Sequence, residues 1–389
     1  MVKDSPLLTI VHVLALIALV IGASALSSGL WGGPPEKPSK SRQLVITEGM
    51  TAAQFGEANQ LPDALVKEAF NLSSDAELDK KIAEFGAPRE ISSLIAGKLA
   101  LAAEHAGKNW LKIRLKFASW LLFLSFVFIY LSRRKLTPSR RIWLLCSSVF
   151  LFGVVLGADP GPMGTVKDAI HLYGTEHVIF PPRMIALALF LALVVLANKY
   201  ICGWGCQAGT LQDLVYQINS TEKQEPRIGR HVKLPFVVTN TFRTLFFGTF
   251  VLVVFLRGTD IIAPLDPFKI YNPASLALSG GIFIAALLLL SMFVYRPWCH
   301  LFCPFGLVGW LLEKVSRAKI TVDYQTCIAC QKCAAACPST VMGAILRRDK
   351  QTIPDCFACY TCRDVCPTGS IQFSKNKRAL PPKDHFTKK

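Results

Sequence analysis

The chain has 389 residues, of which 52% are hydrophobic and 18% are charged, and its mean hydropathy is +0.39. A water-soluble protein of this length carries more charge, so the composition excludes an ordinary soluble enzyme. The net charge of +17 suits a membrane protein that gathers Lys and Arg on one side, and it favours anionic lipid or an acidic redox partner. We expect no nucleic-acid partner, because the sequence contains no basic module interleaved with aromatic residues.

Six apolar runs predict a polytopic membrane protein that is mainly α, with about six transmembrane helices in a lipid bilayer. Flanking Trp, Tyr, Lys and Arg extend the shorter runs to the bilayer interfaces. The sequence GASAL at 22–26 is typical of a cleavage site, but the long first run and its weak amino-terminal charge favour a retained helix. The six runs are Leu7–Leu30, Phe117–Leu131, Ile142–Gly157, Met184–Ile201, Val237–Leu256 and Gly281–Tyr295.

Basic residues predict the orientation of these helices. They concentrate in segments 133–141, 223–233 and 296–319, which we expect to face the cytoplasm together with both termini. The protein is therefore expected to be a multi-pass protein of a bacterial cytoplasmic (inner) membrane. Arg243, near the inner end of the fifth run, is expected to reach the interface with its long side chain.

The runs also predict how the chain is divided. Residues 31–112 are expected to form a helical insert on the outer side, with a Pro/Gly linker at 32–40 and helices within 51–72, 75–86 and 89–107. The five predicted parts are a first transmembrane helix (1–30), the insert (31–112), a membrane core (113–312), a ferredoxin-like domain (313–375) and a basic tail (376–389).

Two cysteine ladders near the carboxyl terminus point to iron–sulfur clusters. CIACQKCAAACP and CFACYTCRDVCP each read C-x2-C-x2-C-x3-C-P, which is the spacing of bacterial ferredoxins with two [4Fe–4S] clusters. In that arrangement, three thiolates of one ladder and the last thiolate of the other hold each cluster. The predicted sets are Cys327, Cys330, Cys333 and Cys366 for one cluster, and Cys356, Cys359, Cys362 and Cys337 for the other.

Structural zinc is the alternative for such cysteines, because four thiolates can close a tetrahedral site. Two complete ladders that both end in Pro favour clusters instead. Iron–sulfur ligands need a compartment in which thiols stay reduced. We therefore predict a cytoplasmic, α+β, two-cluster ferredoxin-like domain of the bacterial type.

Four further cysteines form two C-x3-C pairs, at the ends of the fourth and sixth runs. CGWGCQAG and CHLFCPFG each follow an Asp-Pro loop and a spanning helix, which indicates a short internal repeat. Residues four apart share one face of a helix, so two converging helix ends would bring the four thiols together at the membrane edge. Three interpretations stay open: a further iron–sulfur or other metal site, a redox-active dithiol relay, and buried packing cysteines, as expected for the lone Cys146. The paired cysteines are Cys202, Cys206, Cys299 and Cys303.

Together, the two ladders, both C-x3-C pairs and the Asp-Pro loops resemble membrane-bound 4Fe–4S polyferredoxins of the NapH type, the quinol dehydrogenase component of periplasmic nitrate reductase systems. Similar cores occur in NosR and in the oxidase-assembly protein CcoG. The resemblance covers about residues 115–372. It implies electron transfer between the quinone pool and redox partner proteins, with the ferredoxin-like domain in the cytoplasm. We expect the chain to depart from the NosR and CcoG types, since these 389 residues show no sign of a flavin-binding outer domain or a carboxyl-terminal β-sandwich.

We therefore expect a membrane electron-transfer protein that connects the quinone pool or a partner redox protein with two [4Fe–4S] clusters, as a quinol-dehydrogenase-type subunit of a larger oxidoreductase. The alternative is an assembly or regulatory factor for a metalloenzyme, which reduces copper or senses redox state. The sequence contains neither C-x-x-C-H for haem nor G-x-x-x-x-G-K-[ST] for nucleotides. It leaves open the partner, the direction of electron flow and the oligomeric state.

Quinone chemistry also requires proton transfer. Six acidic and histidine side chains in the predicted outer loops are candidates, although capping of helices and loops is the simpler explanation for them. They are Asp159, Asp168, His171, His177, Asp260 and Asp266.

Overall fold

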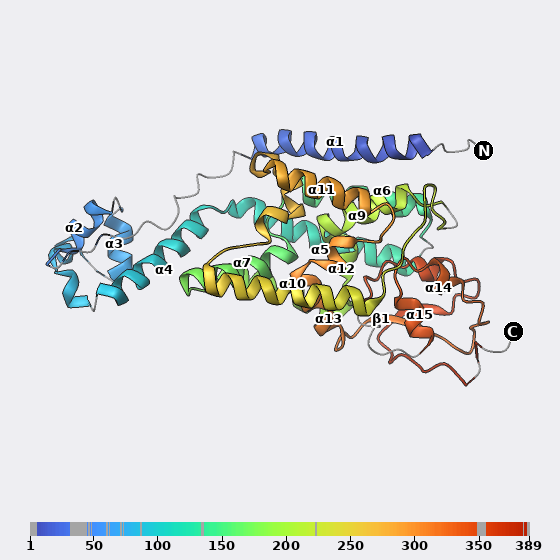
Figure 1. Cartoon of the computed structure of the whole chain (residues 1–389). Coiled ribbons are helices and arrows are strands. Elements are labelled where there is room, and N and C mark those ends of the chain that lie inside the picture. The colour runs from blue at the N-terminus through green and yellow to red at the C-terminus, as the bar shows by residue number, and fades with distance from the viewer. Residues whose placement is uncertain are drawn as a thin grey trace.

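A computed structural model shows a bundle of long helices with a segment of cysteine-containing loops at one end and a small helical unit at the other (Figure 1). The predicted linker at 32–40 lies outside the described residues. The structure describes residues 6–31, 49–59, 63–70, 74–85, 88–133, 136–221, 224–347, 355–383 and 385–386, and the single positions 45, 47, 61 and 72.

All six predicted apolar runs fold as helices. Among the described residues, four helical spans are long and apolar enough to cross a membrane. They are α1 (Pro6–Leu30), α5 (Trp110–Arg133), α6 (Pro138–Ser148) continued by the π-helical segment η3 (Val149–Val155), and α10 (Phe236–Arg257). The other two runs form shorter apolar helices, α8 (Pro181–Ala197) and α11 (Leu278–Leu290). Length and composition therefore support four of the six predicted spans.

Local signals explain where these helices begin and end. Pro138 and Pro181 occupy first turns, where the missing N–H has no helical partner to lose. Thr137 caps α6 by accepting a hydrogen bond from the Arg140 N–H at 3.4 Å. Gly258 ends α10 in the left-handed conformation (φ 63°) that glycine adopts without strain.

The insert between α1 and α5 is helical, as predicted. Its helices are α2 (Ala52–Ala58), α3 (Asp63–Phe70) and α4 (Pro88–Ala106), and α4 leads toward α5 (Figure 1). The prediction of one helix across 75–86 is wrong, because this stretch forms two 3₁₀ turns, η1 (Asp75–Asp79) and η2 (Ile82–Phe85). Phe55, Val66, Ile82 and Ile95 are buried in a small core of their own.

The core contains two similar chain reversals. After α8, the chain forms a π-helical turn, η4 (Ile201–Gly205), and returns as α9 (Gln207–Ile218). After α11, it forms α12 (Pro297–Leu301) and returns as α13 (Pro304–Glu313). The remaining core elements are α7 (Pro162–Glu176) and the 3₁₀ turns η5 (Ala263–Leu265), η6 (Pro267–Tyr271) and η7 (Pro273–Ser275). Helix α9 packs on α6, and α13 packs on α7 and α8.

The carboxyl-terminal segment is small and mixed, as expected for an α+β unit. Strand β1 (Lys319–Val322) pairs antiparallel with β2 (Ile371–Ser374), and both ladders lie in the chain between these strands. The short helices of the segment are α14 (Lys332–Ala336), α15 (Val341–Leu346) and α16 (Thr361–Asp364). The start of α1 at Pro6 also lies toward this end of the molecule, opposite the insert (Figure 1).

Candidate functional site

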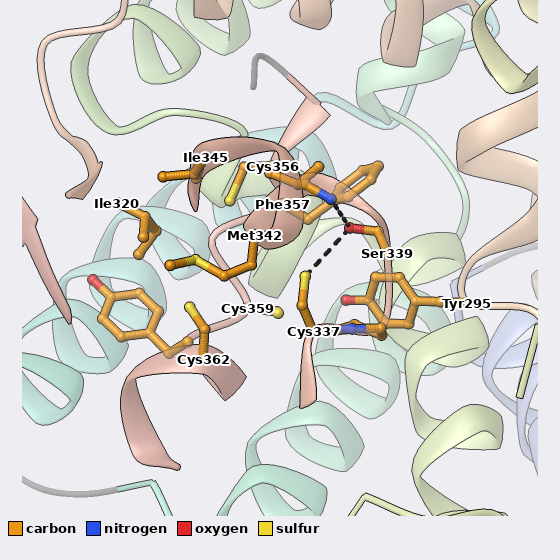
Figure 2. Close-up of a pocket in the computed structure, with 13 residues that line it drawn as sticks. Tyr295, Ile320, Cys337, Ser339, Met342, Ile345, Cys356, Phe357, Cys359 and Cys362 are labelled. Atoms are coloured by element: carbon orange, nitrogen blue, oxygen red, sulfur yellow. Dashed lines mark hydrogen bonds between the residues drawn. The ribbon is translucent and has the colours of Figure 1, made fainter. Parts of the chain in front are cut away.

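Each cysteine ladder folds around a small pocket that also receives one cysteine from the other ladder. One pocket is lined by Cys327, Cys330, Cys333 and Cys366. The other is lined by Cys337, Cys356, Cys359 and Cys362 (Figure 2). The structure therefore brings together the same two sets of four thiols that the ladder spacing predicts.

The two ladders share an unusual backbone. Ala329 and Gln331 in the first ladder, and Ala358 and Tyr360 in the second, have φ between 50° and 64°. Residues other than glycine adopt this left-handed region at a cost of about 1–2 kcal/mol each. The same positions are affected in both ladders, and turns of this kind point successive backbone N–H groups into a concave site that suits an anion. An iron–sulfur cluster with its four thiolates is such a group.

The pockets have the donors and surroundings that a [4Fe–4S] cluster needs. Met342 and Ile345 help to line the second pocket, and burial raises the pKa of Cys333 to about 11 and that of Cys362 well above its usual range. A bound metal ion removes the thiol proton outright. Among the described residues, no three His, Cys, Asp or Glu side chains are arranged to hold one metal ion. In a cubane each thiolate binds a different iron, so the thiolates stand farther apart than around a single ion.

The structure also brings the two C-x3-C pairs together. Cys206, Cys299 and Cys303 are close enough to Cys202 to act electrostatically on its thiol, and all four are buried. The expected arrangement of each pair on one helix face is wrong, because each pair spans a helix break. Cys202 lies in η4 and Cys206 just before α9, while Cys299 lies in α12 and Cys303 just before α13.

The first C-x3-C pair lies beside the middle of two candidate spans. Trp120, in the middle of α5, donates its indole N–H to the Gly205 carbonyl at 2.9 Å. Ser148, within the span formed by α6 and η3, donates its hydroxyl to the Trp204 carbonyl at 2.7 Å. The first pair thus lies level with the interior of α5 and of the span formed by α6 and η3, and its position relative to a membrane edge stays a prediction. Within the membrane interior, irregular backbone is tolerated where protein surrounds it. Broken helices that surround a central binding site are an example.

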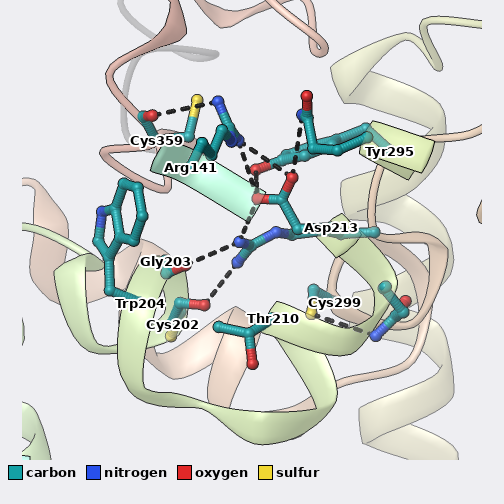
Figure 3. Close-up of polar contacts among 12 residues, drawn as sticks. Arg141, Cys202, Gly203, Trp204, Thr210, Asp213, Tyr295, Cys299 and Cys359 are labelled. Carbon is teal, nitrogen blue, oxygen red and sulfur yellow. Dashed lines mark hydrogen bonds and ion pairs between the residues drawn. The ribbon is translucent and has the colours of Figure 1, made fainter. Parts of the chain in front are cut away.

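Asp213 in α9 connects the first pair to the second ladder (Figure 3). Its carboxylate accepts hydrogen bonds from Arg141 at 2.9 and 3.0 Å and from Arg296 at 2.6 Å. Arg141 also donates to the Cys359 carbonyl at 3.3 Å, and Arg296 donates to the Gly203 carbonyl at 2.8 Å. Both arginines were expected in cytoplasmic loop segments. They are instead buried, because their charges meet one carboxylate inside the fold.

Asp355, which directly precedes the second ladder, connects it to the core in the same way. It pairs with Lys199 at 2.5 Å, with Arg243 at 3.4 Å and with Nδ1 of His300 at 3.0 Å. Arg243 is fully buried and also donates to the Cys299 carbonyl at 3.3 Å. The expectation that Arg243 extends to the interface is therefore wrong, because a buried carboxylate lies within its reach.

The second ladder sits directly on the first C-x3-C pair. Trp204 donates its indole N–H to the Ala358 carbonyl at 3.1 Å. The ring of Phe357 lies beneath the ammonium of Lys199, 4.2 Å from the ring centroid. Gly203 leaves room for this contact, since a Cβ at Gly203 would overlap the Phe357 carbonyl oxygen. Packed side chains and backbone thus run without a break from the four buried thiols to the second ladder.

Replacing Gly203 with Ala is expected to weaken this contact by about 1–3 kcal/mol, because the added methyl group forces two backbones apart. Limited proteolysis of the carboxyl-terminal segment, together with unfolding in detergent, measures the effect. The control is Gly248→Ala in α10, where nothing lies within 4 Å of the new Cβ and Ala favours the helix. Equal protease resistance in the two variants would contradict the prediction.

Positive charge exceeds negative charge around the thiols and the second ladder. Five cationic side chains there are at most 3% exposed, whereas three carboxyl groups are buried among the described residues. Unpaired buried charge is expensive, so this surplus favours an anionic group nearby. The cations are Lys116, Arg141, Lys199, Arg243 and Arg296, and the carboxyl groups are those of Asp213, Glu313 and Asp355.

The residues that connect the two cysteine groups do not stand out in the sequence. They are Asp213, Asp355, Lys199 and Phe357. One signal was available for Asp355, which stands immediately before the second ladder. Another was available for Asp213, an acidic residue in a short stretch after the first C-x3-C pair. Neither position indicates which cation the aspartate pairs with, because those cations are distant in the chain.

Comparisons with protein families match the same parts of the chain. A 4Fe-4S dicluster domain matches residues 319–367, which contain both ladders. A 4Fe-4S binding domain matches residues 179–232 and 276–322, and each of these segments contains one C-x3-C pair. No solved structure matches the chain.

Several curated proteins are similar to this chain at modest identity. YccM of Escherichia coli K12, named for electron transport, is 28% identical over 213 residues, which is 51% of this chain and 58% of that protein. The ferredoxin-type protein NapH of Haemophilus influenzae is 26% identical over 302 residues, covering 71% of this chain and 97% of NapH. The methylamine utilization ferredoxin-type protein MauN of Methylorubrum extorquens is 27% identical over 268 residues, covering 63% of this chain and 85% of MauN.

Proposed function

Because the chain is a 4Fe–4S polyferredoxin-like protein with two [4Fe–4S] clusters, we propose that it passes electrons between the quinone pool or a partner redox protein and these clusters within a membrane. The main support for this proposal is the direct contact between the second ladder and the first C-x3-C pair. Trp204 donates a hydrogen bond to the ladder, and Gly203 packs against the Phe357 carbonyl. Clusters that only stabilise a soluble domain would not need direct contact with the membrane core.

The ladder cysteines are assigned as the ligands of the two clusters, in the two sets that line the two pockets. A bound cluster supplies one-electron redox chemistry. The chain's own residues hold the ligands at fixed spacing and exclude water with apolar walls. They also place buried cations beside the second ladder, where Arg141 contacts the Cys359 carbonyl and Lys199 faces Phe357.

The same proposal assigns a further iron–sulfur cluster to the four buried thiols of the C-x3-C pairs. The surplus of buried positive charge around them supports an anionic occupant. The match of a 4Fe-4S binding domain to both segments supports iron–sulfur chemistry rather than packing. The assigned ligands are Cys202, Cys206, Cys299 and Cys303.

The proposal includes the orientation and division of the chain. The ferredoxin-like domain (313–375) faces the cytoplasm of a bacterial inner membrane, and the insert (31–112) faces outward. The start of α1 at Pro6 lies toward the ladder end and the insert lies at the opposite end (Figure 1), which supports this proposed topology. Anionic lipid and a redox partner protein are then the neighbours of the basic cytoplasmic side.

Anaerobic purification with iron and sulfide analysis, EPR and rapid reduction by a quinol analogue tests the proposal. We expect reducible [4Fe–4S] signals that appear with the analogue as well as with dithionite. Iron-free protein would contradict the assignment of the ladders. Clusters that dithionite reduces and neither the analogue nor any protein donor reduces would contradict electron transfer and favour an assembly or regulatory role.

A further inference from the structure

A pocket between the first turns of α5, α7 and α8 lies at the end of the core that is opposite the ladders. We propose that this pocket binds the hydroquinone head group of a lipid-soluble quinol and delivers its electrons toward Cys206. This inference rests on the proposed function and assigns it a substrate site. The residues that line the pocket include Trp110, Phe117, Asp159, Gly164, Asp168 and Arg183.

The walls of the pocket suit a flat apolar ring. Trp110 and Phe117 of α5 line it together with Phe180, which precedes α8, and the rings of Trp110 and Phe180 are 6.4 Å apart. Residues beside these on the same helices are apolar and exposed, among them Leu111 at 63% and Ile185 at 63%. Exposed apolar side chains on these spans face lipid, so a ligand with an isoprenoid-type tail reaches the pocket from the bilayer.

Polar groups are placed to orient an oxygen-bearing ring. The indole N–H of Trp110 is buried and has no hydrogen-bond partner among the described residues, so it is free to donate to a ligand oxygen. Asp159 and Asp168 both lie next to Gly164, because a Cβ there would lie 3.8 Å from Oδ1 of Asp159 and 3.3 Å from Oδ2 of Asp168. Arg183 lies 3.9 Å from Asp168, so the polar corner carries both signs of charge.

The pocket is joined to the buried thiols by direct contacts. Phe117, in the pocket wall, packs edge-on against Trp120 with ring centroids 5.5 Å apart. Trp120 donates to the Gly205 carbonyl, one residue before Cys206. On the other side, Gln207 donates to the Ala158 carbonyl at 2.8 Å, and Ala158 adjoins Asp159. Trp120 and Gln207 therefore connect the pocket to the residues next to Cys206.

The oxidation of a hydroquinone at this pocket can be balanced in electrons and protons. A hydroquinone loses two O–H bonds and becomes a quinone, which releases two electrons and two protons. The electrons leave singly, and each of the two ladder clusters, when bound, would accept one of them. The protons pass to the carboxylates of Asp159 and Asp168 and from the exposed Asp159 to solvent. No further oxidant or reductant is required.

The test is a binding titration of the full cluster-containing protein in detergent with a fluorescent hydroxyquinoline N-oxide, a quinol analogue whose emission is quenched when it binds. Trp110→Phe keeps the ring and removes the N–H, so we expect binding about tenfold weaker. Trp310→Phe is the matched control, since its indole N–H is also buried and has no partner in the described part of the chain, but lies in α13, outside the pocket. Its affinity is expected to stay within about twofold of the unmodified protein.

Gly164→Ala provides a second variant that separates binding from folding. The position lies within α7, where Ala is the better helix former, yet the methyl group intrudes between Asp159 and Asp168. Several-fold weaker binding with an unchanged unfolding midpoint supports the site. Unchanged affinity in both pocket variants overturns it, and so does a probe that binds neither the unmodified protein nor the control. If a quinol then still reduces the clusters, the proposed function stands and the pocket assignment alone fails.

Discussion

Replacing Cys202 with Ser is expected to lower the iron content of the anaerobically purified protein from about twelve to about eight per chain, because each [4Fe–4S] cluster carries four irons. The loss follows from removing one of four thiolates around a buried site that has no replacement donor of equal softness. Colorimetric iron and sulfide assays with EPR spin quantitation measure it. The ladder signals should remain, since Cys202 lines neither ladder pocket.

The control for this experiment is Cys146→Ser. Cys146 is half-buried in α6 and packs against the main core, so it tests the general effect of replacing a cysteine in the membrane core. It should leave the iron content unchanged. Eight irons in the unmodified protein, or equal iron in both variants, would show that the four buried thiols hold no cluster.

Asp213→Asn is expected to destabilise the protein by about 3–5 kcal/mol, the usual result of breaking a buried ion pair by removing one partner. The substitution leaves the guanidinium groups of Arg141 and Arg296 buried with no carboxylate between them. It also loosens both cysteine groups at once, since these arginines hold the Cys359 and Gly203 carbonyls. Unfolding in detergent, followed by loss of the visible absorbance of the clusters, measures the change.

The matched control is Glu77→Gln in the insert. Glu77 pairs with Lys80 at 2.6 Å, but both side chains are partly exposed, so the pair contributes at most about 0.5 kcal/mol. A difference of less than 1 kcal/mol between the two variants would mean that Asp213 does not hold the core and the second ladder together. The comparison therefore separates a buried connection from an ordinary surface pair.

The buried charges also explain why the ladders can stay attached to a membrane core. Asp213 and Asp355 each meet two cations, and one cation of each set also binds a carbonyl of a C-x3-C pair. In the low dielectric of a packed core, such hydrogen-bonded pairs fix geometry more than they add net stability. A fixed geometry is what electron transfer between neighbouring centres requires.

The sequence by itself determined the chemistry and the helices. The ladder spacing specifies which thiols share a pocket. Three cysteines of one ladder are close in the chain and line the same pocket, and the fourth cysteine comes from the other ladder, as the repeated spacing predicts. The apolar runs specify helices, because a 3.6-residue turn satisfies every backbone group within the run itself. Both are local properties, and a single sequence is enough to predict them.

Only the tertiary structure decided where the C-x3-C pairs lie and which charges meet. Asp213 and Arg141 are 72 positions apart, and Arg243 and Asp355 are 112 apart, so no local pattern links them. An arginine next to an apolar run looks the same in sequence whether it faces water or a buried carboxylate. The chain reversals after α8 and α11 bring those partners together, and contacts with α5 and α6 stabilise the broken backbone of the first reversal.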